Sequence, residues 1–137
     1  MLFKNQISDP IHDHVQIHEQ ALEIVSRYKK SEGELIEMIQ RVEKCRIYLR
    51  RGYPSLFQYV VRDLGLTENV AYSLITVARK SIEIPEIKVR IQAGTLSLSS
   101  AKKILPVINW DNQSEWLEKA QSMSTRQLEK HVVQVNP

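Results

Sequence analysis

A chain of 137 residues has the length of one domain, or of one domain with a helical arm. Its hydrophobic residues (42%) and charged residues (26%) are typical of a globular protein with a core, and its net charge of +3 is too small to indicate a nucleic-acid partner by itself. The single cysteine, Cys45, excludes an internal disulfide and a cysteine-based zinc site.

The composition also predicts the fold class and the compartment. No apolar run approaches the ~18 residues of a membrane span, and the N-terminus lacks a signal-peptide core, so we expect a cytoplasmic protein that does not associate with a membrane. Glycine is scarce, with 4 residues, and the alternating pattern of strands is absent. We therefore predict an all-α, multi-helix domain.

Two helices are predicted in the first third of the chain. An acidic cap followed by proline indicates a helix over about 10–28. Ser31 and Glu34 then match a capping box, which predicts a second helix over about 31–51. Residues 1–51 should therefore form a long helical hairpin or arm. The apolar content of the second helix fits two alternatives equally, a homodimer interface and a long core helix within one copy.

Basic residues gather toward the end of the second predicted helix. One interpretation is contact with phosphates, because neutralised phosphates release counterions and add affinity without sequence choice. The other is a solvated helix face that pairs with Glu37 and Glu43. The residues concerned are Arg41, Lys44, Arg46, Arg50 and Arg51.

The stretch 53–80 predicts a helix-turn-helix, the central feature of the chain. Ser55 is placed to cap a short first helix, and Gly65 ends it because glycine adopts a left-handed backbone at little cost. Thr67 then caps a second helix, which in such motifs enters a major groove. The same pattern also fits an ordinary helical hairpin in an all-α domain.

The second helix of this motif has an apolar side and a polar side. The side that we expect in the core comprises Val70, Ala71, Leu74, Ile75 and Ala78. The side that we expect to face outward comprises Glu68, Asn69, Tyr72, Ser73, Thr76, Arg79 and Lys80. Glu68 counts against groove insertion, because its carboxylate would repel phosphate.

Four further helices are predicted after residue 84, so that residues 52–137 form a helix-turn-helix domain with C-terminal helices. Pro85 opens a helix at about 86–93, and Ser97 caps one at about 98–105. Apolar spacing predicts a helix at about 113–122, and a capping box of Ser124 and Gln127 starts one at about 125–135. Lys102 and Lys103 should point outward from the second of these helices. In total the chain should contain about eight helices.

Residues 52–107 resemble two groups of DNA-binding proteins. The helical N-terminal region of many bacterial HNH endonuclease-type proteins is similar to GYPSLFQYVVRDLGLTENVAYSLITVAR. The helix-turn-helix part of ParB and KorB-like DNA-binding proteins is similar to the same segment continued through IPEIKVRIQAGTLSLSSAKKILPVI. The resemblance implies double-stranded DNA as the partner, and often a dimer. It also implies base-facing or phosphate-facing roles for Thr67, Glu68, Asn69, Tyr72 and Ser73.

The chain departs from both groups outside this segment. Nothing after Val107 resembles the metal-binding His/Asn/His module of an HNH nuclease, and the nucleotide-binding motif of ParB-like proteins is missing. We therefore expect no enzyme activity, no catalytic residues, no cofactor and no small-molecule substrate. The chain would be a regulator, or the DNA-binding part of an HNH-type protein without its nuclease domain.

One pair of histidines has metal-ligand spacing. His14 and His18 are four residues apart and so share one helix face, with Asp13 and Glu19 adjacent in sequence. Such a pair supplies only two ligands, and no second cluster completes it. We predict no metal site.

Two functional hypotheses follow from these patterns. The first is a DNA-binding module, and its alternative is a helical protein–protein interaction module, an adaptor or inhibitor that grips a protein through residues 9–51. The DNA-binding hypothesis predicts a site that comprises Thr67, Asn69, Tyr72, Ser73, Thr76, Arg79, Lys80, Arg46, Arg50, Arg51, Lys102 and Lys103.

Overall fold

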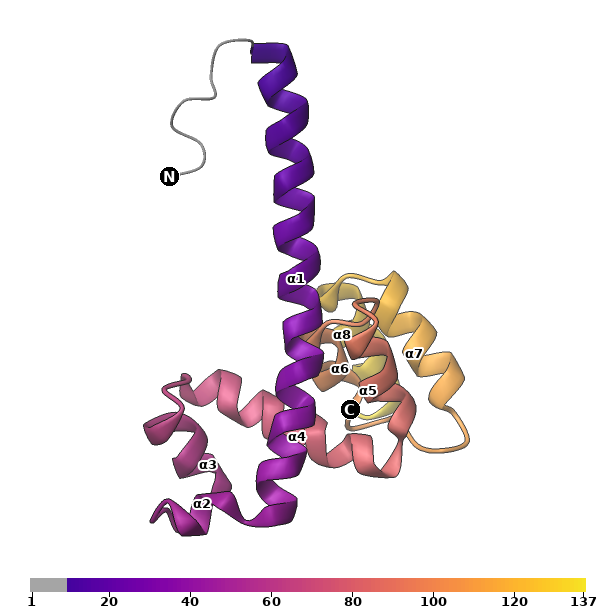
Figure 1. Ribbon diagram of the computed structural model, residues 1–137. Helices are drawn as coiled ribbons and strands as arrows, with labels where there is room; N and C mark the ends of the chain where they lie inside the picture. The colour runs from indigo at the N-terminus through magenta and orange to yellow at the C-terminus, as the bar shows by residue number, and fades with distance from the viewer. Residues whose placement is uncertain (1–9) are drawn as a thin grey trace.

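The computed structural model describes residues 10–137, and every regular element in that part of the chain is helical, which confirms the all-α prediction. Figure 1 shows α1 as a long shaft, with the other helices gathered around its C-terminal half. The elements are α1 (Pro10–Cys45), α2 (Ile47–Arg50), α3 (Leu56–Gln58), a π-helical turn η1 (Tyr59–Asp63), α4 (Glu68–Glu83), α5 (Pro85–Gln92), α6 (Leu98–Ile104), α7 (Gln113–Ser122) and α8 (Thr125–Val135).

The predicted break between two N-terminal helices is wrong. Helix α1 runs without interruption for 36 residues, so residues 31–45 continue the first helix and do not fold back on it as a hairpin. The Ser31 hydroxyl donates a hydrogen bond of 2.6 Å to the Tyr28 carbonyl inside the helix, where it cannot cap a new one. The helix ends at Cys45, earlier than predicted, because Arg46 adopts a left-handed backbone with φ of 54°.

The C-terminal half of α1 belongs to the same core as the helices that follow it. Ile36 and Ile39 are fully buried and lie in one cluster with Leu74 of α4 and with Ile87 and Ile91 of α5. Helix α1 therefore has two parts with different surroundings. Its second half lies in the core, while its first half stands clear of the other helices in Figure 1.

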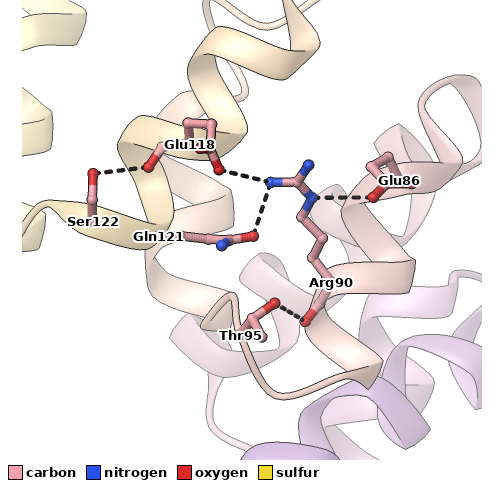
Figure 2. Close-up of polar contacts among 6 residues, drawn as sticks. All are labelled: Glu86, Arg90, Thr95, Glu118, Gln121 and Ser122. Atoms are coloured by element: carbon pink, nitrogen blue, oxygen red, sulfur yellow. Dashed lines mark hydrogen bonds and ion pairs between the residues drawn. The ribbon is translucent and has the colours of Figure 1, made fainter.

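A polar network ties α5 to α7. Figure 2 shows the Arg90 guanidinium between these helices: it donates to the Glu86 carboxylate at 3.1 Å and to the Gln121 side-chain oxygen at 2.9 Å. Glu118 lies 3.6 Å away, and the Thr95 hydroxyl donates to the Arg90 carbonyl at 3.2 Å. The Arg90 side chain therefore links α5 to α7, and carboxylates already neutralise its charge.

Within residues 10–137, no helix is both long enough and apolar enough to cross a membrane.

Candidate nucleic-acid interface

The two caps predicted for the helix-turn-helix are confirmed. The Ser55 side chain accepts a hydrogen bond from the Gln58 N–H at 3.1 Å, and Thr67 accepts one from the Val70 N–H at 3.3 Å. Between them Gly65 has φ of 78°, the left-handed conformation that glycine was expected to supply. The Thr67 hydroxyl oxygen therefore accepts from the backbone at the start of α4, while its O–H remains a donor.

The first helix of the motif is not an ordinary α-helix. After one turn of α3 the backbone widens into η1, where the Leu64 N–H bonds to the Tyr59 carbonyl five residues back. This π-helical bond closes the first helix of the motif at Leu64, and the chain then reverses at Gly65.

The polar side of α4 is open at its N-terminal end. Asn69 is exposed and Tyr72 is 55% exposed, whereas Ser73 and Thr76 are half-buried. The Thr76 hydroxyl donates to the Tyr72 carbonyl at 2.9 Å, so it is satisfied within the helix. Glu68, Asn69 and Tyr72 are therefore open to a partner at this end of α4, and the exposed Glu68 carboxylate still counts against contact with phosphate.

The predicted apolar side of α4 is correct except at Val70. Ala71, Leu74, Ile75 and Ala78 are buried as expected, but Val70 is 40% exposed. Val77 is fully buried in the core, although it was not assigned to that side. Helix α1 crosses α4 near Ala78, where the Gln40 side chain donates to the Ala78 carbonyl. The C-terminal half of α4, which includes Val77, is therefore more deeply buried than Val70 near its N-terminus.

Several of the predicted phosphate-binding cations are already held by carboxylates. Arg79 pairs with Glu43 of α1 at 2.7 Å, and Arg51 pairs with Asp63 at 2.7 Å. The remaining two are Lys103, which lies 3.0 Å from Glu129, and Lys80, which lies 3.8 Å from Glu83. The sequence prediction assigned Arg51 and Lys103 to phosphates, and Arg79 and Lys80 to the DNA-facing side of α4, without these partners. Each side chain must leave a carboxylate to contact a phosphate.

The other predicted cations are more available. Arg46 and Arg50 are exposed and form no ion pair within the described part of the chain. Lys102 of α6 places its Nζ 4.7 Å from the centre of the Tyr72 ring, a cation–π geometry. A positive charge thus lies beside the open polar face of α4.

The Arg51–Asp63 pair predicts a measurable pH dependence. The hydrogen bond from Arg51 lowers the pKa of Asp63 below its ordinary value of 3.8, and the Lys88 hydrogen bond lowers the pKa of Glu37 likewise. A lowered folded-state pKa contributes stability above the unfolded pKa that is lost as the pH falls through the folded value. Urea unfolding between pH 6 and pH 3 (about three units) should therefore show falling stability at the acid end. Asp63→Asn should flatten that fall, and an unchanged pH profile in this variant would contradict the assignment.

The histidine pair of α1 does not belong to a metal-binding cluster in the described residues. His14 and His18 are both exposed on α1. From the side chains that the structure describes, no group of three or more histidine, cysteine or acidic residues could hold an ion.

No family model, no curated protein and no solved structure matches this chain. The resemblance to HNH-type and ParB-like proteins therefore stays a prediction from the sequence.

Proposed function

We propose that the chain binds double-stranded DNA, with the N-terminal end of α4 in the major groove. The observation that carries the proposal is the exposed pair Asn69 and Tyr72 in the first two turns of α4 after the Thr67 cap, with the Lys102 cation over the Tyr72 ring. In helix-turn-helix proteins the N-terminal residues of the second helix contact the base edges.

The side chains of this face suit the two tasks that such an interface requires. The Asn69 amide has the donor and acceptor needed for a bidentate contact with the N6 and N7 atoms of adenine. Tyr72 offers a hydroxyl to a phosphate or a base edge. Lys102, Arg46 and Arg50 would supply the charge that binds phosphates irrespective of sequence.

Salt dependence tests the phosphate contacts. With three phosphates neutralised, the slope of log affinity against log salt should be about −2.7, so affinity for a random duplex should fall roughly 40-fold between 50 and 200 mM salt. Fluorescence anisotropy with the full chain measures this slope. Lys102→Ala, Arg46→Ala and Arg50→Ala should each reduce its magnitude by about 1.

The adjacent lysine is the matched control for this experiment. Lys103→Ala removes the same charge one residue away, but Lys103 is engaged with Glu129, so the slope should change little. Equal effects of the two lysine variants would contradict the assigned surface. Absence of binding at low salt would contradict DNA binding itself.

Base recognition has a separate readout. On a duplex selected from a random pool, Asn69→Ala should weaken specific binding by about 1–3 kcal/mol while binding to random duplex is retained. Undiminished specificity in this variant would show that another surface reads the bases.

A second candidate, a helical protein–protein interaction module, is supported by the exposed apolar side chains on the first half of α1, among them Ile24 and Tyr28. It predicts no salt-sensitive affinity for DNA, so the anisotropy titration separates the two candidates.

A further inference from the structure

The first half of α1 exposes an apolar stripe that nothing in the described structure covers. From residue 14 to residue 30, here called the α1 arm, every side chain is exposed. Ile17 is 49% exposed, Ile24 51% and Tyr28 66%. At 1.5 Å per residue the arm is about 25 Å long. Large apolar side chains on a free helix of this length indicate a partner.

The spacing of the stripe is that of a coiled coil. Ile17, Ala21, Ile24 and Tyr28 are separated by four, three and four residues, the spacing of a and d positions in a heptad. Ile17, Gln20, Ala21 and Ile24 together line one apolar depression. These are residues i, i+3, i+4 and i+7, the four that form the hole for a knob from a facing helix. The arm is therefore shaped to receive another helix.

The distribution of charge along the arm favours a second copy of this chain as the partner, in the antiparallel direction. Glu19 lies in the first half of the arm and Glu23 near its middle, whereas Arg27, Lys29 and Lys30 lie in the second half, and all five are exposed. Parallel pairing of two copies would place like charges beside each other. Antiparallel pairing places the acidic half of each copy along the basic half of the other, which favours association electrostatically.

The body of the protein continues the surface along which an antiparallel partner would run. A groove at the base of the arm is lined by Tyr28 and Leu35 of α1, Val70 of α4 and Leu98 of α6, among others. The N-terminal end of α1 from an antiparallel partner would lie toward this groove. A partner helix in the groove would also bury the exposed side chain of Val70.

We infer that a second copy of this chain packs antiparallel against the α1 arm, as a two-stranded coiled coil centred between Ala21 and Ile24. In this register Ala21 faces Ile24 of the second copy, and Ile17 faces its Tyr28. The paired seam, residues 17–28, includes none of the residues assigned to DNA contact, whereas the groove at the base of the arm also includes Asn69 and Ser73. Ile24→Glu in the seam and Asn69→Ala on α4 therefore test the two proposals on separate residues.

Solution mass tests the association. In sedimentation velocity at about 100 μM the main species should have twice the 15.9 kDa mass of one chain, because a homodimer forms by mass action. Ile24→Glu should halve the mass while the helical circular dichroism of the chain is retained. The matched control is Val15→Glu, which introduces the same charge at an exposed site outside the stripe and should remain dimeric. A wild-type chain at 15.9 kDa, or dissociation of both variants, would overturn the inference.

Disulfide trapping tests the direction. In a Cys45→Ser background, a mixture of Ile17→Cys and Tyr28→Cys chains should form the mixed disulfide, which mass spectrometry identifies. Ile17→Cys alone should not cross-link, because the two sulfurs would lie about 16 Å apart along the axis. Efficient cross-linking of Ile17→Cys with itself would show parallel pairing and overturn the antiparallel arrangement.

Discussion

Replacing Gly33 with alanine should destabilise the protein, although alanine is the better helix former by about 1 kcal/mol. Gly33 lies in α1 where this helix crosses α5. A Cβ atom there would lie 2.6 Å from the Cα atom of Gln92 and 2.9 Å from its backbone nitrogen. Backbone atoms cannot rotate away as a side chain does, so α1 and α5 must separate. We expect a loss of about 1–3 kcal/mol in the free energy of unfolding, the usual cost of overpacking.

Urea unfolding followed by circular dichroism measures this loss. The matched control is Ser26→Ala, which makes an alanine on the exposed arm of the same helix and should change stability by less than about 0.5 kcal/mol. If Gly33→Ala were as stable as the wild type or more so, the close crossing of α1 and α5 would be wrong.

Replacing Leu128 with alanine should have an effect at least as large, because this residue anchors the last helix. Leu128 is fully buried and is the one buried residue of α8, which packs mainly against α6. Truncating a buried leucine removes its transfer free energy and leaves a cavity, at a cost of about 2–5 kcal/mol. Hydrogen exchange should show that the amides of α8 lose protection before those of α4.

Val133→Ala is the control on the same helix. Val133 is 58% exposed, so its truncation should cost less than about 0.5 kcal/mol. Similar losses in the two variants would mean that α8 does not dock through Leu128.

Local signals in the sequence determined the helix class and most helix starts. Ser55, Thr67, Ser97 and Ser124 each cap the helix predicted for them, and Ser124 forms a capping box with Gln127. Such signals are reliable here because a cap bonds to a backbone group only three residues away, so no distant segment needs to be known.

The tertiary structure alone decided how far α1 continues, that Val70 of α4 is exposed and which cations are free. Ser31 matches a capping box, yet it lies inside α1, where a backbone carbonyl satisfies its hydroxyl. Arg79 looks available in the sequence, but it pairs with Glu43, which is 36 residues away. The Ser31 hydrogen bond is local, but α1 continues past Ser31 into a segment whose Ile36 and Ile39 are buried with residues of α4 and α5. The core contacts of this segment and the Arg79 pair form only when the chain packs, and spacing along the chain carries no record of them.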